Sequence, residues 1–247
     1  MQKPPELLYQ YRPPSERARC NLERQIMYFS DPANFNDPLD CPENPCFSNL
    51  SGAIEIMRQN NRLNPPWVSP DKKAHDAAVK RWREMRESVG IACLSERPFN
   101  QRMWSHYGGS AKGFCLEFDT RDVALFGDDI LHPVRYAEYP PYPDAAVVLA
   151  GNIDKTRRLF LTKGKKWEDE QEWRLIRKEK GEVRYNAEAL TTIYLGIAAD
   201  KKTEEFVRQV KQEQYPHVSL YKAFPLGYSF GFEPLDICST EKPYAAE

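Results

Sequence analysis

The chain has 247 residues, of which 41% are hydrophobic, 29% charged and 12% aromatic. This composition excludes a disordered chain, a fibrous rod and a small disulfide-stapled scaffold, and a chain of this length can bury a substantial core. The 35 Lys and Arg residues nearly balance the 36 Asp and Glu residues, so the net charge is −1. This excludes a basic field over the whole protein for nucleic acid or anionic lipid, but it leaves a local basic patch open.

The sequence gives only weak signals for membrane insertion, secretion or disulfide formation. No stretch approaches the roughly 18 apolar residues of a membrane-spanning helix. Residues 1–6 lack the apolar core of a secretory signal. The six cysteines are scattered and form no disulfide framework. These features predict a soluble cytoplasmic protein with reduced thiols and no membrane partner.

The first 30 residues predict two strands flanking a short helix. Residues 7–12 are apolar and aromatic and stop at Pro13 and Pro14, while residues 26–29 contain no turn-forming residue. Residues 15–24 between them can form the helix.

Two helices are then predicted as an insertion between strands, at about residues 48–88. A proline-rich connector at residues 64–66 separates them, and Ser69 with Pro70 provides the N-cap and first position of the second helix, which Gly90 closes. Apolar residues recur at helical spacing in both: Leu50, Ala53, Ile54 and Met57, then Ala74, Ala78, Trp82 and Met85.

The remainder alternates between further strands and helices. Strands are predicted at residues 90–94, 113–119, 134–139, 173–177, 192–195 and 218–224, and helices from Asp144 to near Gly164 and over residues 202–212. In residues 113–119, Phe114, Leu116 and Phe118 share one face of the strand, opposite Cys115, Glu117 and Asp119. The prediction is one compact α+β domain over residues 1–235, with a mixed sheet of short strands and a mobile tail at 236–247.

The first candidate site is Arg12, at the end of the first predicted strand. A guanidinium there can hold a phosphate or carboxylate through two parallel hydrogen bonds. The alternative is a strand-edge arginine with its head in water.

Residues 35–40 are better explained as a turn, because Asn36 and Asp37 precede Pro38. Asp37 and Asp40 can also contact a cation, but two carboxylates without further ligands are weak evidence for a site.

The densest polar segment joins residues 93–96 to residues 103–109. Ser95, Trp104, His106 and Tyr107 lie near a pair of glycines that allow close approach of another group. Trp104 and Tyr107 are three residues apart, so a helical turn places them on one side, where aromatic rings can form a pocket wall. The alternative is that Trp104 belongs to the core and His106 makes a buried hydrogen bond.

The last candidate segment, residues 163–176, changes from basic to acidic and then enters a strand. If the chain is already extended there, Glu170 and Glu172 face the same side as Arg174. These residues then form an ion pair, or the glutamate stabilises a developing cation or accepts a sugar hydroxyl.

Taken in order, these segments resemble a bacterial family of unknown function, domain of unknown function 2971, over roughly residues 7–200. The matching segments are residues 8–12, 26–30, 35–40, 91–96, 103–107, 112–119 and 167–176. This resemblance implies membership and no activity.

A second resemblance is to the ADP-ribosyltransferase superfamily. It implies that Arg12 holds the NAD nucleotide, that Ser95 and Tyr107 frame the nicotinamide, and that Glu172 binds the ribose. The sequence departs from that superfamily because it lacks the Ser-Thr-Ser triplet of one branch, and because His106 follows the central strand instead of lying on the first.

The leading hypothesis is an NAD-consuming transferase, acting as a toxin or defence effector on a protein or nucleic-acid acceptor. Its catalytic residue is Glu172, and its cofactor-binding residues are Arg12, Ser95, Trp104, His106 and Tyr107. A non-catalytic nucleotide- or protein-binding module is the alternative. A metal-dependent nuclease is a third hypothesis, which requires Asp37, Asp40, Glu117 and Asp119 to converge in space.

Overall fold

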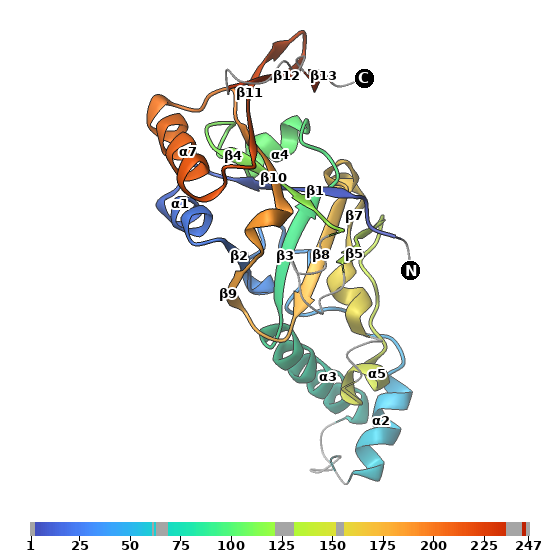
Figure 1. Ribbon diagram of the computed structural model, residues 1–247. Coiled ribbons are helices and arrows are strands. Elements are labelled where there is room, and N and C mark those ends of the chain that lie inside the picture. Colours follow the sequence, from blue (N-terminus) through green and yellow to red (C-terminus); the bar gives the residue numbers. More distant parts are fainter. Residues whose placement is uncertain are drawn as a thin grey trace.

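The computed structural model describes residues 3–60, 62, 69–121, 131–151, 156–235 and 244–245 (Figure 1). The strands are β1 (Leu7–Arg12), β2 (Ile26–Phe29), β3 (Gly90–Ser95), β4 (Phe114–Asp119), β5 (Leu131–Pro133), β6 (Arg135–Ala137), β7 (Thr162–Gly164), β8 (Glu172–Arg177), β9 (Gly181–Arg184), β10 (Leu190–Leu195), β11 (Ser219–Leu226), β12 (Ser229–Pro234) and β13 (Tyr244–Ala245). The α-helices are α1 (Glu16–Glu23), α2 (Leu50–Gln59), α3 (Pro70–Glu87), α4 (Gln101–His106), α5 (Ala145–Leu149) and α7 (Lys201–Gln214). Short 3-10 helices are η1 (Pro32–Asn34), η3 (Arg157–Leu161), η4 (Lys165–Glu170) and η5 (Ala187–Ala189).

A mixed sheet forms the centre of the molecule. Within the described ranges it contains nine strands in the order β13-β12-β11-β10-β4-β1-β3-β8-β5. The first strand of the chain, β1, lies inside this sheet and pairs antiparallel with both β3 and β4, while β10 and β11 are parallel. Two-stranded sheets β2-β9 and β6-β7 lie beside it. The α+β class predicted from the sequence is confirmed.

The two faces of the sheet are covered by different helices. On one face, Leu116 and Phe118 of β4 belong to a core that includes Leu22 of α1 and Val207 of α7. On the other face, Cys115 packs in a cluster with Tyr9, Tyr11 and α4. The alternation predicted for residues 113–119 is therefore confirmed.

The predicted helical segment between strands is formed by α2 and α3, which lie with α5 beyond one end of the sheet (Figure 1). Ser69 caps α3 by accepting a hydrogen bond from the Lys72 amide, and Pro70 occupies its first turn, as predicted. The predicted face of α3 is buried, and its Trp82 stacks on Phe160 at 5.0 Å. The helix ends at Glu87, however, and Gly90 begins β3 instead of closing it.

The long helix predicted from Asp144 to near Gly164 is wrong. Asp144 does cap a helix, but α5 ends after Leu149, because Gly151 follows in the left-handed conformation with φ +68°. Residues 152–155 lie outside the described part of the chain, and beyond them come η3 and β7. The weak strand predicted at residues 134–139 is shorter, at β6.

The predicted tail falls mostly outside the described residues, which resume only at β13, antiparallel to β12. Among the residues that the structure describes, no helix is both long and apolar enough to cross a membrane.

Gly113 directly precedes β4 and lies against the end of β1, where it allows the two backbones to approach closely. A Cβ built there would lie 1.9 Å from the Arg12 carbonyl oxygen. We expect Gly113→Ala to lower the free energy of unfolding by about 1–3 kcal/mol, because one backbone must move away from the other. Urea denaturation measures this loss.

The matched control is Gly164→Ala. A Cβ at Gly164 would have its nearest neighbour at 3.8 Å, which is ordinary contact. The two variants differ in this clearance, so equal stability of both would contradict the close approach at Gly113.

Candidate functional site

A cavity of about 270 Å³ opens between the central sheet and the segments that follow β2 and α4. Arg12 from the end of β1 contributes to its wall, as does Tyr107, which directly follows α4. Glu172 from the start of β8 and Lys163 from β7 contribute charged groups. Parts of the chain that are far apart in sequence therefore share one concave surface.

Three of the predicted site residues meet in this cavity: Arg12, Tyr107 and Glu172. Arg12 is near because β1 pairs with β3, and β3 pairs with β8 in a register that sets Ser95 opposite Glu172. The sheet order thus places the end of the first strand close to the start of a strand about 160 positions later.

A buried charge cluster forms one wall of the cavity. Arg174 makes a two-pronged interaction with Glu172, with Nε 2.7 Å from Oε1 and Nη2 3.1 Å from Oε2. The same guanidinium grips Asp40, with Nη1 2.9 Å from Oδ1, and donates to the Phe160 carbonyl at 2.8 Å. Arg174 is completely buried, so these partners replace the water that its charge has lost.

Lys163 is the second cation of the cluster and is also buried. Its Nζ lies 3.0 Å from Glu172 Oε2 and also bonds Glu170. Burial alone would raise the pKa of Glu172, but Arg174 and Lys163 outweigh it and lower that pKa to about 2. Glu172 is therefore an anion at neutral pH, and it is held by two cations.

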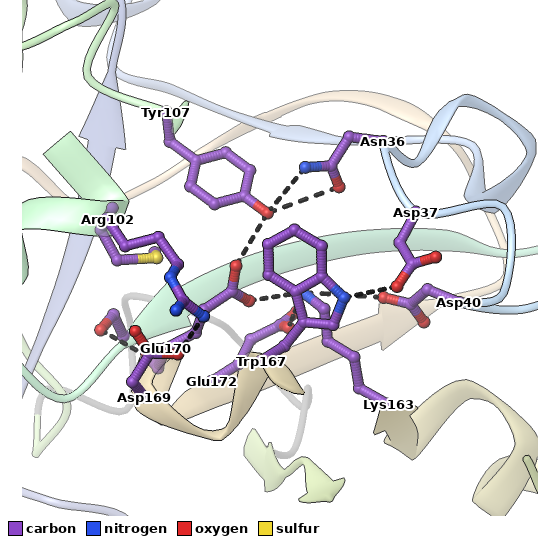
Figure 2. Close-up of polar contacts among 12 residues, drawn as sticks. Asn36, Asp37, Asp40, Arg102, Tyr107, Lys163, Trp167, Asp169, Glu170 and Glu172 are labelled. Atoms are coloured by element: carbon purple, nitrogen blue, oxygen red, sulfur yellow. Dashed lines mark hydrogen bonds and ion pairs between the residues drawn. The ribbon is translucent and has the colours of Figure 1, made fainter. Parts of the chain in front are cut away.

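Glu170 differs from Glu172, because it is bonded by only one cation of the cluster (Figure 2). Its Oε1 accepts a hydrogen bond from the Tyr107 hydroxyl at 3.1 Å, and that hydroxyl also lies within reach of the Asn36 amide. Burial raises the pKa of Glu170, and Lys163 offsets only part of that rise. This carboxyl is therefore easier to protonate than an ordinary glutamate.

Trp167, which lies in η4, covers one side of the charge cluster. Its indole nitrogen donates to Asp37, whose other oxygen accepts from the Leu39 amide at 3.0 Å (Figure 2). The turn predicted at residues 35–40 is confirmed by that second hydrogen bond.

Arg12 lies on the cavity wall formed by β1. Its Nη2 donates to the Gln10 side chain at 2.7 Å, and no carboxylate in the described ranges pairs with it. Burial lowers the pKa of Arg12 to about 10, so it remains a cation at neutral pH. A partly buried guanidinium with an amide as its neighbour is suited to an anionic ligand group.

Three other predicted residues do not line the cavity. Ser95 is fully buried, and its hydroxyl donates to the Glu170 carbonyl at 2.7 Å, so it positions that segment. Trp104 is 1% exposed in the core, where its ring meets Tyr11 edge-on at 5.2 Å. His106 is exposed, with its ring 5.8 Å from Trp167.

The placements of Ser95, Trp104 and His106 correct the sequence-based picture in one respect. Of the two aromatic residues expected to form a pocket wall, Tyr107 lines the cavity and Trp104 does not. Trp104 supports the wall from behind through Tyr11, which itself lines the cavity. Short-range spacing placed both aromatics near the site, but helix α4 turns the indole into the core.

Lys163 and Asp40 are the cluster members whose part in the site the sequence did not reveal. Glu172 and Arg174 share one side of β8, as predicted. The chain is not extended at Glu170, which ends η4, and Gln171 is left-handed with φ +44°. Glu170 meets Glu172 through their shared bond to Lys163 instead. Asp40 reaches Arg174 across 134 positions, and Lys163 lies on a strand that was predicted as helix. No local pattern marks either contact.

The four carboxylates of the nuclease hypothesis do not converge. Glu117 is not part of the cavity lining and accepts hydrogen bonds from Thr192 and Tyr194 of β10, and Asp119 pairs with Arg121. Across the described residues, no group of three or more potential ligands is arranged to hold a metal ion. The convergence that the nuclease hypothesis requires is therefore not found among the described residues.

Residues 103–175 match the profile of a family described as "Protein of unknown function (DUF2971)". The match covers less than a third of the chain, but it runs from α4 to β8 and includes Tyr107, Lys163, Glu170, Glu172 and Arg174. The match therefore supports the resemblance to this family for the part of the chain that supplies most of the charged wall. Comparisons with curated proteins and with solved structures find no match.

The buried cluster predicts a large difference between two neighbouring lysines. We expect Lys163→Met to lower the free energy of unfolding by about 3–5 kcal/mol, because Glu170 and Glu172 would lose a buried cation. Chemical denaturation monitored by tryptophan fluorescence measures this change.

Lys165→Met is the matched control. Lys165 pairs with Glu138 at 3.2 Å, but both side chains are more than half exposed. We expect a change within about 1 kcal/mol for this variant. A Lys163→Met protein as stable as the control would show that the cluster does not need its lysine.

Proposed function

We propose that this protein is an NAD-consuming, ADP-ribosyltransferase-like enzyme that acts as a toxin or defence effector, and that the reaction takes place in the cavity. The single observation that carries this proposal is that Arg12, Tyr107 and Glu172 line one cavity although they come from three distant segments. Each of the three has the chemistry that one part of NAD requires.

We assign Glu172 to stabilising the transition state. When the bond between nicotinamide and ribose breaks, the electron pair leaves with nicotinamide and positive charge develops on the ribose. A fixed, ionised carboxylate stabilises that charge. The low pKa of Glu172 keeps it ionised, and Arg174 and Lys163 hold it in one position.

Arg12 and Tyr107 are assigned to binding. The guanidinium of Arg12 is a cation to which a phosphate can bond, and the Tyr107 ring is a wall for the flat nicotinamide. The cavity, at about 270 Å³, is slightly below the usual range for small-molecule sites of about 300–1,000 Å³. It therefore suits the nicotinamide–ribose end of NAD, with the rest of the dinucleotide toward solvent.

We assign Glu170 to taking the proton from the attacking acceptor group. A hydroxyl or amine that attacks the ribose must lose a proton, and a carboxylate with a raised pKa accepts a proton more readily than an ordinary one. Its hydrogen bond from Tyr107 places it beside the proposed nicotinamide wall.

The test is nicotinamide release from NAD by the purified protein, followed by chromatography. We expect release by the wild type and at least about a 100-fold loss in Glu172→Gln, because the amide keeps the shape and removes the charge. Glu182→Gln is the matched control, since Glu182 is a partly exposed strand glutamate whose ion pair is with Arg24. Full activity in Glu172→Gln would refute the assigned role.

Because Glu172 is buried, replacing it can unfold the protein, and unfolding must be distinguished from a loss of catalytic activity. Thermal unfolding of each variant provides that check. Arg12→Gln adds an independent readout: we expect a raised KM for NAD with a smaller change in kcat, since its proposed contact is with phosphate in the ground state and in the transition state alike.

A non-catalytic nucleotide- or protein-binding module is the second candidate. It is favoured because the negative charge of Glu172 is already compensated by neighbouring cations. Arg174 bonds both of its oxygens, and Lys163 also bonds one of them. In that case ADP-ribose raises the melting temperature while no nicotinamide is released. A protein-binding module without a nucleotide site would show neither effect.

A further inference from the structure

A second concave surface, a groove of about 1,020 Å³, lies on the outer side of the two-stranded sheet β6-β7. Arg135 and Thr162 are register partners in that sheet, and both line the groove. The next pair along, Tyr136 and Lys163, points the other way: Lys163 lines the cavity, and the Tyr136 hydroxyl accepts a hydrogen bond from the Glu172 amide. The groove and the cavity are therefore opposite faces of one thin wall.

Two exposed tyrosines stand at the groove. Tyr139 is 77% exposed and Tyr142 is 63% exposed, and three prolines lie among and after them in Tyr-Pro-Pro-Tyr-Pro. The backbone of this segment is anchored, because the Ser48 amide donates to the Pro143 carbonyl at 2.9 Å. Aromatic side chains on a proline-restricted, anchored backbone lose little conformational entropy when a partner binds.

The charge of the groove is positive. Arg135 and Arg158 line it and are exposed, and within the described ranges neither pairs with a carboxylate. The carboxylate at the groove, Asp144, is already engaged: it caps α5 and accepts two hydrogen bonds from Asn49. The groove therefore presents two cations, which no described carboxylate pairs with, beside two aromatic rings.

We propose that this groove binds an extended acidic peptide segment of a partner protein. Its volume is at the upper end of what a compact small molecule fills, and it suits several residues of an extended chain. Tyrosine and arginine are the residue types that dominate binding energy in protein interfaces, and a guanidinium bonds a carboxylate in two-pronged geometry.

Nucleic acid is disfavoured on this surface. Affinity for nucleic acid grows with the number of phosphates that Lys and Arg neutralise. Two arginines on a chain of net charge −1 supply few such contacts. The groove inference does not depend on NAD chemistry in the cavity, so either proposal can fail alone.

The test is fluorescence anisotropy with a labelled peptide of alternating Glu and Pro residues. Peptides of alternating Lys and Pro and an oligothymidine of equal length serve as the comparison probes. We expect the Glu-Pro peptide to bind more tightly than either, and its binding to weaken as salt is raised. Tighter binding of oligothymidine, or no binding of the Glu-Pro peptide, would overturn the proposal.

The variants assign that binding to the groove. The double variant Arg135→Glu with Arg158→Glu is expected to weaken peptide binding at least about tenfold, because it reverses the charge at exposed positions. Tyr139→Ala with Tyr142→Ala is expected to weaken it without changing its salt dependence. Arg184→Glu is the matched control, since Arg184 is an exposed arginine on the other two-stranded sheet. Equal losses in the control and the groove variants would overturn the proposal.

Discussion

The ion pairing of Arg174 is the interaction on which the site depends. A buried guanidinium loses several kcal/mol of hydration, and only well-placed anions compensate for it. Arg174 finds them in Glu172, two residues before it, and in Asp40, 134 positions away. This requirement ties the loop after β2 to strand β8 and brings Asn36 toward Tyr107. The cavity exists between these segments because the charges hold them together.

The two glutamates of the cluster have different properties because they have different neighbours. Glu172 is bonded by two cations and stays ionised, whereas Glu170 shares one cation with a phenol and has a raised pKa. A pair of carboxyls with diverging pKa values is typical of sites where one group stabilises charge and the other moves a proton. Arg12 of β1 adds a positive charge to the cavity lining outside this cluster.

The small sheet β6-β7 has a larger role than its size suggests. Strand alternation sends Lys163 and Tyr136 toward the charge cluster and sends Thr162 and Arg135 to the outer groove. One face of the small sheet thereby borders the cavity, and the other borders the groove. A side chain that binds in the groove is separated from the charge cluster by a single layer of backbone.

The sequence by itself determined the local elements with strong periodicity. It predicted α3 with its cap and buried face, the alternation in β4, and the shared side of Glu172 and Arg174, because spacing of 3.6 or 2 is a property of neighbouring residues. Tertiary structure alone decided that Arg12 and Glu172 meet, that Trp104 turns into the core and that Asp40 partners Arg174. Those outcomes depend on strand order and on where buried charges find partners, and neither leaves a trace in short-range spacing.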